Sequence, residues 1–210
     1  SYTGQMIRQI RVLVFTLLAA THLGACEPVS MAIGAGAATG VAAYQERGIE
    51  GVASDTRIKL EILKNWFDAN SGLNKNASVE VYEGRALLTG AMPTEVLRAD
   101  AVKLAWKVEG VVDVLNEITI GTSGGIGELA RDTAITAELK AKLTFDDKVL
   151  AVNYTVITTA GTVHLMGIAQ DKAELDRVIL RARDISYVKR VLSHVRVKIK
   201  DAPKQKANGQ

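Results

Sequence analysis

The chain has 210 residues, of which 48% are hydrophobic, 23% charged and 5% aromatic, an ordinary composition for one large or two small globular domains. Its formal net charge of +3, without any block of like charges, argues against a nucleic-acid-binding protein. The single cysteine, Cys26, excludes an intramolecular disulfide and argues against a cysteine-based metal site.

Residues 1–25 have the pattern of a secretory signal peptide. Arg8 and Arg11 precede an apolar run over residues 12–20, and small residues follow it. The run is too short to cross a bilayer as a helix, which needs about 20 apolar residues. The Leu-Gly-Ala-Cys sequence of residues 23–26 resembles the lipobox of bacterial lipoproteins, whose cysteine carries a diacylglycerol and becomes the new N-terminus. The alternative is a buried cysteine at the end of an uncleaved anchor.

We expect Cys26 to carry a diacylglycerol and an N-acyl chain, with no other cofactor, and to anchor the protein to the outer membrane in the periplasm. Glu27 favours the outer over the inner membrane under the enterobacterial sorting rule. Residues 26–54 would then form the lipidated N-terminus and a tether. Within them, the Gly- and Ala-rich run 31–43 is too short to span a bilayer, so it is either a flexible tether or a segment at the membrane surface.

An internal repeat relates the two halves of the remaining chain at a constant offset of 77 positions, which places Asp55 on Asp132. We therefore expect two tandem domains, residues 55–121 and 132–200, with a linker over residues 122–131 and a disordered tail over 201–210. The matching positions include two glycines in each copy, Gly84 and Gly90 in the first and Gly161 and Gly167 in the second.

The sequence of each copy predicts the same first secondary-structure elements, a helix followed by a hairpin. Asp55 and Asp132 are N-cap candidates for a first helix. Two strands follow around a tight turn, where Gly84 and Gly161 can supply the positive φ of a two-residue hairpin loop. The first helices have apolar residues at helical spacing, which predicts their buried faces: Ile58, Ile62 and Trp66 in the first copy and Ile135, Leu139 and Leu143 in the second.

A second helix and a last strand complete each copy. The helix begins after Thr94 and after Asp171, and Glu174 adds a capping-box pattern to the latter. The last strands alternate apolar and polar residues around Val114 and Val191. The predicted fold class is α+β, with two αββαβ units that each pack two helices on a three-stranded mixed sheet. Units of this size are marginal alone, so we expect the copies to stabilise each other by packing.

These residues resemble the BON domain (bacterial OsmY and nodulation), whose pattern is a hairpin ending in Gly, then Ala-x-x-Leu/Ile-Ala-x-x-Val-x-Gly-Val-x-x-Val. Residues 101–114 follow this pattern, and the second copy departs from it with Tyr187 in place of Gly110. The layout resembles the family of outer-membrane lipoproteins with two BON domains, of the DolP type. That resemblance implies a periplasmic role in envelope integrity or stress resistance and binding of anionic phospholipid, chiefly through the first helix of the second copy. Some relatives carry a Trp where this chain has Ala134, which argues against deep insertion of an aromatic side chain.

The two copies differ in charge. Residues 55–121 contain 8 Lys and Arg against 10 Asp and Glu, a net charge of −2, whereas residues 132–200 contain 12 against 8, a net charge of +4. Each basic group near an anionic membrane contributes about 1 kcal/mol, so the second copy is expected to contact anionic phospholipid or an acidic partner. An ordinary solvated face is the open alternative. Basic residues on one face of the last strand are His194, Arg196, Lys198 and Lys200. The candidate phospholipid-binding residues are Thr133, Ile135, Lys140, Lys142, Lys189 and Arg190.

No motif of an enzyme is present, so we expect neither catalytic residues nor a metal site. His164 and His194 lie on separate predicted strands, and His164 aligns with Leu87, which predicts a packed histidine. The two tryptophans, Trp66 and Trp106, are also expected to pack. Two functions therefore remain: phospholipid binding, and an envelope adaptor that docks a protein partner through exposed sheet edges.

Overall fold

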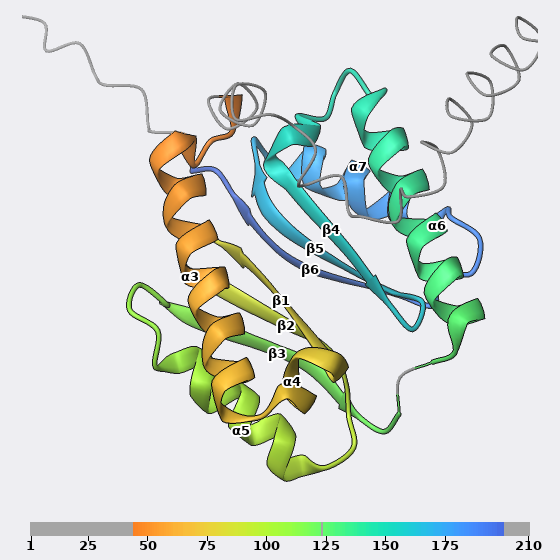
Figure 1. Cartoon of the computed structure of the whole chain (residues 1–210). Helices are drawn as coiled ribbons and strands as arrows, with labels where there is room; N and C mark the ends of the chain where they lie inside the picture. Colours follow the sequence, from red (N-terminus) through yellow and green to blue (C-terminus); the bar gives the residue numbers. More distant parts are fainter. Residues whose placement is uncertain (1–43, 123, 200–210) are drawn as a thin grey trace, which may run out of the picture. The chain divides into compact units, whose positions relative to one another are not determined.

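The computed structural model describes residues 44–122 and 124–199, drawn in colour in Figure 1. The expected lipid-attachment residue Cys26, the signal peptide, the run 31–43 and the tail 201–210 lie outside the described residues. Within the described part of the chain, no helix is long and apolar enough to cross a membrane.

The first copy contains three helices and a three-stranded sheet. Its elements are, in chain order, α3 (Gly48–Ala69), α4 (Ser71–Asn76), β1 (Ala77–Tyr82), β2 (Arg85–Met92), α5 (Glu95–Trp106) and β3 (Asp113–Ile120). The strand order is β1-β2-β3, with β1 and β2 antiparallel and β2 and β3 parallel. The short helix α4 is absent from the sequence prediction.

The second copy repeats this topology and confirms the predicted α+β class. Its elements are α6 (Ile126–Thr144), the 3₁₀ helix η2 (Ala151–Asn153), β4 (Tyr154–Thr159), β5 (Thr162–Ala169), α7 (Lys172–Arg183) and β6 (Arg190–Val197). The order β4-β5-β6 again combines an antiparallel and a parallel pair.

Each sheet has its two main helices on one face, and a separate core lies between them (Figure 1). All six apolar positions predicted for the buried faces of the first helices are at most 3% exposed. Trp66 is fully buried and its Nε1 donates a 3.0 Å hydrogen bond to the carbonyl of Ala101. Trp106 is 49% exposed, so its expected packing is wrong. It directly follows buried Ala105, and successive helical residues point in directions about 100° apart.

The two-residue hairpin turns are confirmed. Glu83 and Gly84 have φ values of 51° and 72°, and Ala160 and Gly161 have 52° and 78°. Positive φ at both central residues is the geometry of a type I′ turn, whose twist matches that of the flanking strands. Glycine is further required at Gly84 because a Cβ there would lie 2.6 Å from a backbone carbonyl oxygen.

The N-cap assignment of Asp55 and Asp132 is wrong. α3 begins at Gly48 and α6 at Ile126, so both aspartates lie inside their helices. Each helix therefore takes in residues that were predicted to be tether or linker. Asp55 is 5% exposed and Asp132 is 8% exposed, which an N-cap residue facing solvent would not be.

Each buried aspartate instead holds the hairpin turn of its own copy. The carboxylate accepts hydrogen bonds from both backbone N–H groups at the centre of the turn. Charge-assisted hydrogen bonds of this kind are stronger than neutral ones, so the aspartate ties its helix to the sheet. The distances are 2.9 Å from Glu83 and 2.8 Å from Gly84 to Asp55, and 2.7 Å from Ala160 and 2.9 Å from Gly161 to Asp132.

The predicted starts of the second helices are confirmed. The Thr94 hydroxyl accepts a hydrogen bond from the N–H of Leu97, and the Asp171 carboxylate accepts one from the N–H of Glu174. The Glu174 carboxylate reaches farther than a capping box requires. It accepts hydrogen bonds from the backbone N–H groups of Gln170 and Leu150, which links α7 to the loop after α6.

The two copies pack together through their sheets, as expected from the small size of each unit. A third apolar cluster joins Tyr82 and Leu87 of the first copy to Met166 and Ile168 of the second, and all four are at most 3% exposed. Burial of this cluster removes apolar surface from water that each sheet alone would expose. The Arg85 guanidinium also donates a 2.8 Å hydrogen bond across this contact, to the carbonyl of His194.

Candidate functional site

Two basic side chains, Arg196 of the last strand β6 and Lys198 just after it, form ion pairs within the protein. Arg196 forms an ion pair with Glu83 at 2.7 Å, and Lys198 pairs with Glu46 at 3.1 Å. The acidic partners lie on or before the first copy, so the opposite charges of the copies meet at their contact. The expectation that this strand presents a free basic face to a membrane is therefore wrong for these residues, and Lys200 lies outside the described residues.

The outer face of α6, opposite its buried face, is mostly apolar or small. Ile126 is 89% exposed, Leu129 is 67% exposed, and Phe145 at the end of the helix is 87% exposed. A surface helix normally presents charged and polar residues on this side. We define the α6 outer face as Ile126, Leu129, Ala130, Thr133, Ala134, Ala137, Lys140, Ala141 and Phe145. The other exposed residues of α6 are Gly127, Arg131, Glu138 and Thr144.

The equivalent helix of the first copy, α3, has a different outer face. Its exposed side carries two ion pairs of adjacent turns, Arg57 with Glu61 and Lys64 with Asp68. Three of these charged residues are lost in the second copy. Arg57, Lys64 and Asp68 of α3 align with Ala134, Ala141 and Phe145 of α6. The repeat therefore provides an internal comparison at these three positions, where α3 carries charged residues and α6 carries alanine or phenylalanine, although α3 also exposes Leu60 and Phe67.

Basic residues lie at the edge of the α6 outer face. Arg131 and Lys189 line a hollow of about 230 Å³ beside the first half of α6, together with Tyr187. The Arg131 guanidinium lies 5.7 Å from the centre of the Tyr187 ring, within the range of a cation–π contact. Tyr187 has a φ of 69°, at the position where the first copy has Gly110, and is 72% exposed.

The structure separates the six candidate phospholipid-binding residues. Thr133 and Lys140 lie on the α6 outer face, and Lys189 lies in the hollow beside it. Ile135 is 3% exposed and belongs to the core, and it lies at the wall of the same hollow. Its position in the helical period, on the same side as Leu139, accounts for this burial.

The remaining two candidates, Lys142 and Arg190, lie away from the α6 outer face and the hollow beside it. Lys142 is paired with Glu138 at 3.2 Å and with Asp184 at 3.6 Å, which neutralises its charge locally. Arg190, at the start of β6, lines a different hollow on the side of the sheet contact, with His164. Neither residue lies on the α6 outer face.

The apolar part of this site was not predicted from the sequence. Ile126, Leu129 and Arg131 precede Asp132, which was taken to begin the helix, so they were assigned to the linker. The signal that identifies them is the helical spacing of Ile126 and Leu129 with Thr133 and Ala137. Phe145 was missed because it follows the last residue of the buried face.

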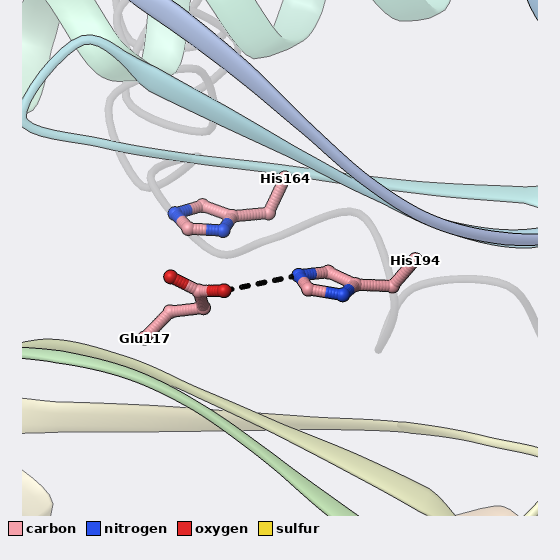
Figure 2. A group of neighbouring side chains, drawn as sticks. All are labelled: Glu117, His164 and His194. Atoms are coloured by element: carbon pink, nitrogen blue, oxygen red, sulfur yellow. Dashed lines mark ion pairs between the residues drawn. The ribbon is translucent and has the colours of Figure 1, made fainter.

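A second group of polar side chains lies at the sheet contact. Glu117 of β3 points toward His164 of β5 and His194 of β6, and one ligand atom of each lies within 4.8 Å of the others (Figure 2). His164 is 3% exposed, as expected for a packed histidine. Burial lowers the pKa of its imidazole to about 4, and the neighbouring His194 and Arg190 act in the same direction. These residues could not be grouped from the sequence, because they come from both copies.

The described domains match a known family twice. The model of the BON domain matches residues 54–122 and residues 131–199, which together cover more than half of the chain.

Several known proteins are similar to this chain over most of their length. The chain is 31% identical to the outer membrane lipoprotein DolP of Haemophilus influenzae over 87% of this chain and 94% of DolP. It is 32% identical to a 21 kDa hemolysin of Actinobacillus pleuropneumoniae, over 70% of this chain and 78% of the relative. It is 31% identical to the osmotically-inducible protein Y of Escherichia coli, over 69% of this chain and 73% of the relative.

One solved structure that is similar to this chain is that of CdsD, a structural protein of the type III secretion system of Chlamydia trachomatis. The alignment covers 70% of this chain and 65% of the CdsD chain, at 20% sequence identity. The TM-score is 0.27, which is too low to bear on fold or function. The two matches to the family model and the repeat of one α+β unit lead to the same conclusion: the chain belongs to the BON-domain family.

Proposed function

We propose that this protein is a lipid-anchored protein of the bacterial envelope whose second BON domain binds anionic phospholipid through the α6 outer face. Cys26 is the proposed attachment site of the anchor, in the periplasmic leaflet of the outer membrane. The similarity to DolP, an outer membrane lipoprotein, supports this location. The role we propose is binding and support of the envelope rather than catalysis.

The observation that carries the proposal is the exchange of charged residues on α3 for apolar ones on α6. Ile126, Leu129 and Phe145 expose large apolar side chains, and small residues separate them. A helix with this outer face can lie in the headgroup region with its apolar side toward the acyl chains. Because four of the nine residues of this face are alanine, we expect shallow contact rather than deep insertion.

Electrostatic attraction would add selectivity for anionic lipid. Lys140 lies within the α6 outer face, and Lys189 lies in the hollow beside it. Neither has an ion pair within the described part of the chain, so both are free to contact phosphate groups. Each basic residue near an anionic membrane surface contributes about 1 kcal/mol. The anchor would hold the protein at the membrane, and the α6 outer face would orient its second domain.

Vesicle flotation of residues 27–210 without the lipid tests this function. We expect co-flotation with phosphatidylglycerol vesicles, weak binding to phosphatidylcholine vesicles, and loss of binding at high salt because surface charges are screened. The double variant Lys140→Gln/Lys189→Gln should weaken binding by about tenfold or more. The matched control Lys103→Gln/Lys107→Gln, which removes two exposed lysines of the first copy, should bind like the parent. Equal binding to both vesicle types would contradict the proposal.

The adaptor function predicts a different outcome in the same variants. A protein that docks on the outer strands of either sheet would not depend on Lys140 or Lys189. Affinity capture that retains the same envelope protein after both lysines are neutralised, together with an absence of vesicle binding, would favour an adaptor.

A further inference from the structure

The contact between the two sheets brings together side chains that are suited to a metal ion. Glu117 comes from β3 of the first copy, and His164 and His194 come from β5 and β6 of the second (Figure 2). Two imidazole nitrogens and one carboxylate oxygen are donors that zinc and other divalent first-row metals accept. We propose that Glu117, His164 and His194 form a site for a divalent transition metal ion, of which Zn²⁺ is the natural probe.

The burial of His164 is the first independent observation for this site. The side chain is 3% exposed, and its Nδ1 has no hydrogen-bond partner among the described residues. A buried polar nitrogen without a partner is costly, and most such atoms in proteins are hydrogen-bonded or bound to water or an ion. The first copy has Leu87 at the aligned position, so an apolar residue can occupy this strand position in the fold. A metal ion would supply the missing partner.

The distances are the second observation. A tetrahedral ion with bonds of about 2.0–2.1 Å holds neighbouring ligand atoms about 3.3 Å apart. The Nε2 atom of His194 lies 3.3 Å from the Oε1 atom of Glu117. The Nε2 atom also has no hydrogen-bond partner among the described residues, although it is buried. All three ligand atoms lie within 4.8 Å of one another, so a small inward movement of His164 completes a three-ligand site.

The surroundings set the expected properties of the site. Glu117 and His164 line a hollow of about 430 Å³, which leaves room for water as a fourth ligand. Lys189 and Arg190 line the same hollow, and their positive charges would repel a bound metal cation. We therefore expect weaker binding than in a closed structural zinc site, and we expect Arg190→Gln to tighten it. Because the ligands come from both copies, a bound ion would hold the two BON domains together.

Calorimetric titration of the full-length chain with ZnCl₂ tests the proposal. We expect one saturable site, a rise in the melting temperature with Zn²⁺, and no effect of Mg²⁺ at the same concentration. His164→Leu places the residue of the first copy at this position and should keep the fold while it weakens Zn²⁺ binding by about 100-fold or more. Glu117→Gln should weaken binding as well, because it removes the ligand charge.

Matched controls distinguish this site from other zinc ligands in the chain. His22→Gln removes the third histidine, and Cys26→Ser removes the only thiol. Glu83→Gln breaks an ion pair at the same sheet contact without removing a proposed ligand. All three should bind Zn²⁺ like the parent. Loss of binding in His22→Gln or Cys26→Ser, with unchanged binding in His164→Leu, would overturn the proposal.

A measurement on the unmodified chain covers the case in which a variant fails to fold. Substitution with Co²⁺ should give the visible bands of a nitrogen- and oxygen-ligated ion without a thiolate-to-cobalt band. Histidine NMR signals of His164 and His194 should shift on Zn²⁺ addition while that of His22 does not. Unchanged signals of His164 and His194 at saturating Zn²⁺ would also overturn the proposal.

Discussion

At the scale of single residues, one aspartate in each copy connects a helix to a hairpin. Asp55 and Asp132 have the same role, but their surroundings differ. Asp55 also pairs with Arg47 at 2.6 Å, and the Arg47 guanidinium lies 4.2 Å above the ring of Tyr82. The second copy has Gly124 at the position that aligns with Arg47, so Asp132 holds its turn without this support. A buried carboxylate with two N–H donors explains why both copies have an aspartate here.

Asp132→Ala should therefore destabilise the protein. The substitution leaves the N–H groups of Ala160 and Gly161 without their acceptor, and a buried donor without a partner costs about 1–3 kcal/mol. Urea denaturation followed by circular dichroism measures the loss. Thr133→Ala, at the exposed neighbouring position, should change the free energy of unfolding by no more than about 0.5 kcal/mol. Equal effects of the two substitutions would contradict the role of Asp132 in holding the hairpin turn.

Tyr82 makes the free energy of unfolding depend on pH in the alkaline range. Burial raises the pKa of its phenol to about 12, from an ordinary value of 10.0, and the Arg47 guanidinium acts in the opposite direction. The unfolded chain loses this proton first, so the stability contribution is complete below pH 10 and falls between pH 10 and 12. Urea denaturation at several pH values should show a loss on the order of 1–3 kcal/mol. Tyr82→Phe should reduce this slope but not remove it, because burial also raises the pKa of the Tyr154 phenol. An unchanged slope would show that Tyr82 does not contribute.

At the scale of secondary-structure elements, the same helix has been adapted to two surroundings. The buried sides of α3 and α6 are equivalent, since Ile58 and Ile62 align with Ile135 and Leu139. The outer sides differ at three aligned positions, where Arg57, Lys64 and Asp68 of α3 form ion pairs and α6 has Ala134, Ala141 and Phe145. Folding requires only the buried side. The proposed membrane contact of α6 would account for the difference between the outer sides at these positions.

Phe145→Asp should weaken membrane binding without loss of stability. It places at the end of α6 the residue type found at the aligned position in α3, Asp68. Phe145 is 87% exposed, so the folded chain loses little packing, while the new charge is repelled by anionic lipid. We expect about fivefold or greater weakening in vesicle flotation and a change in unfolding free energy within about 0.5 kcal/mol. Phe67→Asp, on exposed α3, is the control and should leave flotation unchanged.

Much of each element was predictable from local residue patterns. The hairpins follow from Gly84 and Gly161, and the second helices follow from Thr94 and Asp171, because these residues act through neighbours in the chain. The starts of the first helices were not predictable by the same logic. Asp55 and Asp132 have the residue type of an N-cap, but their partners are the distant hairpin turns.

At the scale of the whole molecule, the contact between the sheets accounts for features that no single copy explains. The acidic first copy and the basic second copy meet there, through pairs such as Glu83 with Arg196. Part of the charge difference between the copies therefore stabilises their association and is not available to a membrane. Neither this pairing nor the grouping of Glu117 with His164 and His194 could be predicted from the repeat, because both depend on how the copies pack.

Leu87→Ala should uncouple the two domains. Leu87 is 1% exposed in the cluster with Tyr82, Met166 and Ile168, so the cavity should cost about 2–5 kcal/mol. If the sheet contact couples the copies, the parent unfolds in one calorimetric transition and the variant in two. Leu60→Ala, at a 59% exposed position of α3, should behave like the parent. Two separate transitions in the parent itself would contradict this coupling.

The most direct test of membrane binding compares equivalent positions on the two first helices. Leu60 of α3 and Ala137 of α6 are aligned and both exposed, so a nitroxide label can be attached to either as a single cysteine in a Cys26→Ser background. On addition of phosphatidylglycerol vesicles, the account predicts that the label at position 137 becomes shielded from water and accessible to oxygen dissolved in the bilayer, while the label at position 60 stays in water. Equal responses at the two positions, or a stronger response at position 60, would contradict it.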